Sequence, residues 1–117
     1  MSMQMRAFEA DGCLTVELEG DIDHHHARLI REEIDRRITE ARPSKVVLEL
    51  SKVAFMDSSG LGLILGRLRT VSERGGRLIL NNPTARTERI LKMAGVDKLL
   101  PIMHDAGVNA YRARKDV

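Results

Sequence analysis

The short polar turn Asp57-Ser58-Ser59-Gly60 is the most informative stretch of this 117-residue chain, because it places a carboxylate and two hydroxyl groups next to each other. It separates an apolar run from a stretch with helical spacing, and α/β sheets expose their functional edge at such strand-to-helix turns. The simplest structural interpretation is that Ser58 or Ser59 caps the helix. Neither serine has the glutamate three residues on that completes a capping box, and Gly60 and Gly62 leave the first helical turn bare. These features favour an exposed turn that functions by modification or binding.

Other chemistries fit this turn less well. Gly60, Gly62 and Gly66 nearly form a dinucleotide-binding fingerprint, but the third glycine comes one position late. The GTPase-like Asp-x-x-Gly pattern lacks a phosphate-binding loop elsewhere, and neither serine has the preceding glycine of a serine hydrolase. We therefore expect no enzyme activity, no catalytic residue and no cofactor. Two alternatives stay open: a receiver-like phosphoacceptor at Asp57, which would lack an adjacent acidic pair for Mg²⁺, and a small nucleotide- or ligand-sensing domain.

Three other features of the sequence could indicate chemistry. Three consecutive histidines begin at His24, but consecutive side chains point in different directions, so we predict a helix start and no metal site. The single cysteine, Cys13, is expected to fill the core. A set of arginines is predicted to lie on a solvated surface that suits an acidic partner: Arg67, Arg69, Arg74 and Arg77.

The hydropathy pattern around these residues predicts an α/β fold. Apolar residues alternate over 14–18 and run together at 46–50 and 78–80, as in strands, whereas 27–41 and 61–71 have helical spacing. Asn82 followed by Pro83 predicts the start of a third helix, and Gly95 its end. Residues 99–103 suggest a last strand and 111–115 a polar helix or tail. We expect one domain with a mixed, mostly parallel sheet of about five strands packed with about four helices.

Composition limits the partners. The chain has 19 Lys and Arg against 17 Asp and Glu, two Phe, one Tyr and no Trp. So small a net charge and so few aromatic rings argue against direct DNA or RNA binding. No apolar run approaches the roughly 20 residues that span a bilayer, and the N-terminus lacks the pattern of a signal peptide, so we predict no membrane association and a cytoplasmic location.

Two segments resemble the anti-sigma factor antagonist family, whose fold is the STAS domain. The loop Gly20-Asp21-Ile22-Asp23-His24-His25 is similar to the family's loop after the second strand, and residues 55–67 are similar to its phosphorylation turn and helix. The order and spacing of elements agree over nearly the whole chain, which implies a single STAS domain over residues 1–117. The Asp-His-His loop and the unbroken run from Leu61 to Arg67 most resemble the sporulation stage II antagonist of spore-forming bacteria. His26 and the basic tail fall outside the resemblance.

The resemblance implies a protein that enzymes modify. In the family, an anti-sigma factor that is an ATP-dependent serine kinase phosphorylates the first serine after the aspartate, here Ser58, and a serine phosphatase removes the phosphate. The unphosphorylated form binds the ATP- or ADP-bound kinase and frees the sporulation sigma factor. A phosphoserine brings about −1.5 to −2 charges, so we expect it to weaken the complex and leave the fold intact. The implied partner-binding residues are Asp23, His24, Asp57, Ser58, Ser59, Gly60 and Gly62.

Overall fold

A five-stranded sheet forms the centre of the protein, of which the computed structural model describes residues 4–104. Its strands lie side by side in chain order: β1 (Gln4–Ala10), β2 (Cys13–Ile22), β3 (Lys45–Met56), β4 (Arg77–Asn81) and β5 (Ile102–Met103). The first pair is antiparallel and the other three pairs are parallel. The prediction of a mixed, mostly parallel sheet is confirmed, and β5 falls inside the predicted last strand.

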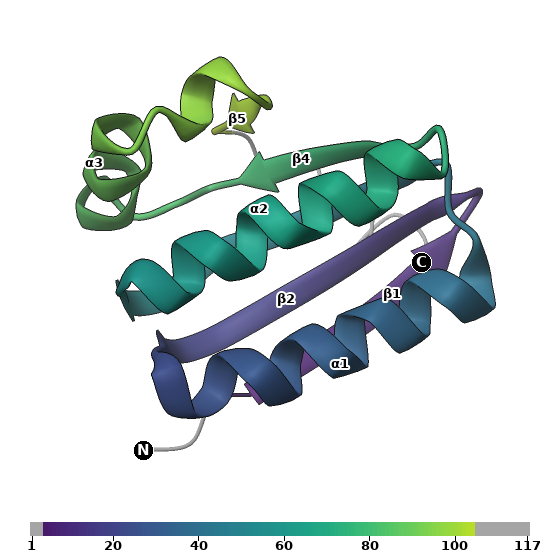
Figure 1. The fold of residues 1–117 in the computed structure, drawn as a ribbon, viewed down its shortest axis with the longest axis horizontal. Helices are drawn as coiled ribbons and strands as arrows, with labels where there is room; N and C mark the ends of the chain where they lie inside the picture. The colour runs from purple at the N-terminus through teal and green to yellow at the C-terminus, as the bar shows by residue number, and fades with distance from the viewer. Residues whose placement is uncertain (1–3, 105–117) are drawn as a thin grey trace, which may run out of the picture.

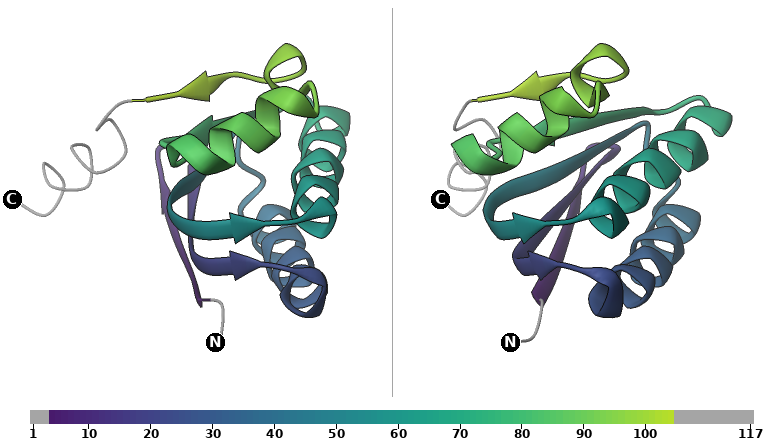
Figure 2. Two further views of the ribbon diagram at one scale, coloured as in Figure 1. Left: turned by 90° about the vertical axis from the view of Figure 1, so that its left-hand side faces the viewer. Right: turned by 60° about the vertical axis from the view of Figure 1, so that its left-hand side comes forward.

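Three α-helices accompany the described part of the sheet: α1 (His24–Ala41), α2 (Ser58–Glu73) and α3 (Ala85–Met93). The first two lie side by side across one face, and α3 lies apart from them, near the end of the sheet where β2 and β3 finish (Figures 1 and 2). A single 3₁₀ turn, Val96–Lys98, follows α3. The predicted number of about four helices is therefore slightly higher than the three in residues 4–104. The predicted helix or tail at 111–115 lies outside the described residues.

The main core fills the space between the sheet and the two side-by-side helices. Helix α1 contributes Ile30, Ile34 and Ile38, whose steps of four residues form one apolar stripe. Strand β3 is buried continuously from Val46 to Leu50, as predicted for a strand covered on both faces. Helix α1 follows β2 after a single residue, and α2 follows β3 after a single residue. The packing of the helices on the sheet therefore places both helix starts at the ends of these strands.

The start of α3 differs from the sequence prediction. Its N-cap is Thr84, whose hydroxyl accepts a hydrogen bond from the Thr87 N–H at 3.2 Å. Asn82 instead follows β4 with a left-handed backbone (φ 56°), and its amide donates to the buried carboxylate of Glu49 at 3.4 Å. Pairing with Glu49 therefore uses the side chain that would have capped the helix. Gly95 follows the helix at φ 79°, as predicted.

Arg67 is the second correction, because it is buried rather than solvated. Its side chain is 6% exposed, and Nε lies 2.9 Å from Oδ1 of Asp35 on α1. Desolvation lowers the pKa of the Arg67 guanidinium, while the charge of Asp35 opposes that shift. Arg67 shares the stripe of Leu63 and Val71, four residues away on either side, and this stripe faces inward. The ion pair joins the two helices, so Arg67 does not belong to a surface cluster.

Candidate functional site

The turns that begin α1 and α2 lie beside each other at the ends of two neighbouring parallel strands (Figures 1 and 2). Ile22 and Met56, the last residues of β2 and β3, are paired in register. The backbone N–H of Asp57 donates to the carbonyl of Ile22 at 3.4 Å. The structure thus brings the Asp23-His24 loop and the Asp57-to-Gly60 turn together, although helix α1 and strand β3 separate them in the sequence.

Asp57 caps α2. Its backbone is extended (φ −106°, ψ −165°), and Oδ1 accepts a hydrogen bond from the Ser59 N–H at 2.8 Å. The interpretation that Ser58 or Ser59 caps this helix is therefore wrong, because the preceding carboxylate already binds the exposed amide. Ser58 is the first residue of the helix, its side chain is exposed, and no hydrogen bond joins its hydroxyl to the described residues. The capping arrangement leaves this hydroxyl available to solvent or to a partner.

Asp23 caps α1 with a similar backbone (φ −113°, ψ −177°). Its Oδ1 accepts from the backbone N–H groups of His25 and His26 at 3.0 and 3.1 Å, and it also lies 2.8 Å from Nδ1 of the His26 ring. Partial desolvation raises the pKa of the Asp23 carboxyl, but the hydrogen bonds and charge of His26 outweigh it, so the net pKa lies below its ordinary value. His26 thereby gains a structural role that the sequence did not reveal.

His24 and His25 differ from His26 in pointing outward. Both are exposed, and their rings meet edge to face with centroids 6.2 Å apart. No group of three or more His, Cys, Asp or Glu side chains within residues 4–104 is arranged to hold a metal ion. The exposed rings therefore lie next to the α2 turn as surface groups, within reach of anything that docks there.

The two glycines of the turn have different surroundings. Gly60 is buried, and a Cβ there would collide with the Met56 side chain and lie 3.2 Å from Cγ2 of Ile22. Gly62 is exposed, and a Cβ there would meet nothing within 4 Å. Gly60 is thus required for packing the start of α2 against the strand ends, whereas Gly62 keeps the outer face of the helix bare. The expectation that both glycines are open to a partner holds only for Gly62.

One neighbour of the site could not be found from the sequence. The guanidinium carbon of Arg86, in the first turn of α3, lies 5.8 Å from the centre of the Phe55 ring, which is 37% exposed. Phe55 stands directly before the Met56-Asp57 step, so this cation–π contact flanks the turn. No local pattern links the two residues, because only the packing of α3 beside β3 brings them together.

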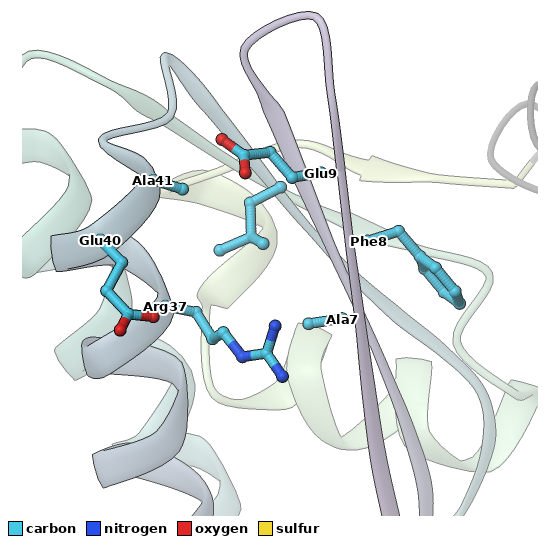
Figure 3. Close-up of a pocket in the computed structure, with 7 residues that line it drawn as sticks. Ala7, Phe8, Glu9, Arg37, Glu40 and Ala41 are labelled. Atoms are coloured by element: carbon cyan, nitrogen blue, oxygen red, sulfur yellow. The ribbon is translucent and has the colours of Figure 1, made fainter.

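A hollow of about 120 Å³ lies elsewhere, between β1 and the last turns of α1 (Figure 3). Arg37 and Glu40 line it from the helix, and Ala7 and Glu9 line it from the strand. Pockets that enclose drug-sized molecules usually measure about 300–1,000 Å³. The hollow is too small to favour a nucleotide-sensing domain, and it is remote from Ser58.

Comparison with known proteins agrees with the geometry. The sequence profile of the STAS domain matches residues 4–107. An anti-sigma F factor antagonist of Paenibacillus polymyxa is 37% identical over 94% of this chain and 93% of its own length. The anti-sigma-B factor antagonist of Bacillus subtilis is 26% identical over 87% and 92%.

Two solved structures of the anti-sigma factor antagonist SpoIIAA match the fold. The unphosphorylated form has a TM-score of 0.79 at 26% identity, and covers 97% of this chain and 98% of SpoIIAA. The phosphorylated form, from Bacillus, has a TM-score of 0.73 at 28% identity, and covers 96% and 98%. The chain is thus similar to a protein whose solved forms differ by phosphorylation.

Proposed function

This chain belongs to the STAS-domain family of anti-sigma factor antagonists, and from that premise we propose that Ser58 is the site of its regulatory phosphate. Members of this family are regulatory binding proteins. In the proposed cycle, an anti-sigma factor serine kinase in its ATP- or ADP-bound form binds the unphosphorylated chain and releases a sporulation sigma factor. Phosphorylation of Ser58 ends this binding, and a serine phosphatase restores it.

The observation that carries the proposal is the uncommitted hydroxyl of Ser58. Asp57 satisfies the Ser59 N–H, so the Ser58 side chain is not needed to hold the helix start. Ser58 is exposed at the edge where β2 and β3 finish, with the bare surface of Gly62 one turn further along α2. A kinase active site needs an accessible hydroxyl of this kind, and the surrounding fold need not open to present it.

Charge explains how one phosphate would break the complex. Phosphoserine adds about −1.5 to −2 charges beside Asp57 and near Asp23. The N-terminus of α2 favours an anion, so the phosphate should sit on the isolated domain without refolding it. A partner surface that fits the neutral hydroxyl would then face added negative charge and its desolvation. A hundredfold loss of affinity corresponds to about 2.7 kcal/mol, which is within reach of such repulsion.

We propose that the partner contacts both turns. Asp23 and His24 would meet it from the start of α1, and Asp57, Ser59 and Gly62 from the start of α2. Gly60 would contribute indirectly, because the absence of a side chain lets the turn pack closely against Met56. A cytoplasmic location fits a partner that controls transcription, and no described helix is both long and apolar enough to cross a bilayer.

The test is site mapping by intact-mass and peptide mass spectrometry after incubation with ATP, Mg²⁺ and the anti-sigma kinase from the same genome. We expect one phosphate, which disappears in Ser58→Ala and persists in the matched control Ser59→Ala. Alkaline hydroxylamine provides a second readout, because it cleaves an acyl phosphate on Asp57 and leaves a phosphoserine intact. Phosphate on Asp57, or none at all, would contradict the proposal and return the receiver or ligand-sensing alternatives.

A further inference from the structure

A cluster of cations lies at the opposite end of the sheet from Ser58, on the turns that lead into β3 and β4 and on the first residue of each of these strands. We call it the basic pole and define it by four exposed side chains: Arg42, Lys45, Arg74 and Arg77. Helix α2 has 16 residues, so at 1.5 Å per residue it separates this pole from Ser58 by about 24 Å. A protein bound at one end would therefore leave the other accessible.

Backbone contacts hold the two turns together. The Arg77 N–H donates to the carbonyl of Ser44 at 3.0 Å, and Lys45 and Arg77 are paired in register on neighbouring strands. Gly76 allows this approach, because a Cβ there would lie 3.2 Å from the Ser44 carbonyl oxygen and 3.0 Å from the Val71 side chain. The basic pole is consequently one continuous surface fixed by the fold.

The four cations have no acidic partner in the part of the chain that the structure describes. Among residues 4–104, no carboxylate oxygen lies within 4.0 Å of their charged nitrogens, whereas Arg36, Arg37 and Arg69 each have such a partner. The Arg74 guanidinium is 3.5 Å from the Thr39 hydroxyl, which leaves its charge uncompensated. In the stretches 11–12, 42–45 and 74–77 the four cations are accompanied by one carboxylate, that of Asp11, so positive charge predominates there.

A favourable interaction with a helix C-terminus accounts for only two of the four cations. Arg42 and Arg74 are the C-caps of α1 and α2, where a cation interacts favourably with the helix dipole. Lys45 and Arg77 stand at the starts of strands, outside the helices, and the two like-charged residues are paired in register across the parallel β3–β4 pair. Like charges in directly opposed positions destabilise a sheet, so the fold alone gives no reason for this pairing.

We infer that the basic pole docks an acidic segment of a second protein, independently of the Ser58 surface. Carboxylates suit it because arginine forms paired, charge-assisted hydrogen bonds with them. Nucleic acid fits less well, since four cations give only weak phosphate binding and no aromatic ring for stacking lies in either turn. A membrane surface fits less well too, because the exposed large apolar side chains among the described residues lie outside 42–45 and 74–77.

The experiment is an NMR titration of the ¹⁵N-labelled full chain with the peptide (Glu-Asp)₅. We expect amide shifts concentrated at 42–45 and 74–77, and affinity that falls as salt rises. The variant Arg74→Glu/Arg77→Glu should weaken binding at least tenfold. The matched control Arg89→Glu/Lys98→Glu makes the same change of net charge at exposed positions elsewhere and should change affinity less than twofold.

Several outcomes would overturn the inference. If both variants lose the same affinity for the peptide, net charge alone explains the binding. If the amide shifts are centred outside 42–45 and 74–77, the peptide binds to a different surface. Tighter binding to a short DNA duplex, or to vesicles containing phosphatidylglycerol, would assign a different class of partner. Circular dichroism checks that the variants fold. Phosphorylation of Ser58 in Arg74→Glu/Arg77→Glu should proceed as in the unchanged chain, so failure here and failure of the proposed switch are separable.

Discussion

The starts of α1 and α2 both need an acceptor for their exposed backbone N–H groups, and they differ in the residues that follow it. Both begin directly after a strand, and both use an extended aspartate whose carboxylate accepts hydrogen bonds from the following amides. After Asp23 come three histidines, one of which also binds the capping carboxylate through its ring. After Asp57 come two serines and a buried glycine, and no described side chain covers Ser58. Capping thus stabilises both turns, and only the second presents a free hydroxyl.

Adding negative charge near the start of each helix should separate the two turns most strongly. We expect phosphorylation of Ser58 to weaken binding of the anti-sigma kinase about a hundredfold, or about 2.7 kcal/mol, through repulsion beside Asp57. His25→Glu, on the exposed start of α1, should cost less than threefold. Isothermal titration calorimetry measures both. Similar losses would mean that the total charge of the edge, rather than its position, controls the complex.

Gly60 and Gly62 distinguish the inner and outer sides of the α2 turn. Gly60→Ala forces a methyl group into the Met56 side chain and should destabilise the fold by about 1–3 kcal/mol. Gly62→Ala meets open space and should stabilise the helix by up to about 1 kcal/mol. Urea unfolding gives both values. If Gly62→Ala instead destabilises the free domain, its surroundings are more crowded than the structure shows.

The capping aspartates should behave alike when truncated. Asp23→Ala and Asp57→Ala each remove the acceptor for helix-start amides and should cost about 1 kcal/mol, whereas Asn at either position retains a capping oxygen and should cost much less. Thermal unfolding monitored by circular dichroism tests the four variants. A large loss in Asp57→Asn would show that the charge of Asp57, and not its hydrogen bond, stabilises the turn.

Acid should affect the α1 cap slightly. Because the pKa of the Asp23 carboxyl is lowered in the folded chain, its contribution to stability is present above the unfolded pKa and is lost as pH falls through the folded pKa. Carboxyl-detected NMR should place the Asp23 midpoint below 3.8. His26→Ala should raise that midpoint by removing the ring contact. No change in that variant would assign the shift to the backbone hydrogen bonds alone.

Local patterns predicted much of the architecture. The apolar residues of α1 recur at helical spacing and are buried along one side, and the apolar run of β3 is buried on both sides. Their spacing therefore predicts an amphipathic helix and a central strand. The same patterns located the polar turn at residues 57–60 between two such elements, whereas Ser58 as the phosphorylated residue rests on the resemblance to the family and stays a prediction. The errors came where side chains have distant partners: Asn82 pairs with Glu49 and so does not cap α3, and Arg67 turns inward to Asp35.

The sequence by itself determined the strand-to-helix turn with its two serines and the family to which the chain belongs, because these depend on residue order and spacing along the chain. Only the tertiary structure decided which side chains are free. It assigned the α2 cap to Asp57, buried Gly60 under the strand ends, placed Arg86 over Phe55 and joined two basic turns into one pole. Such contacts join residues that are distant in the chain, and packing in three dimensions selects them.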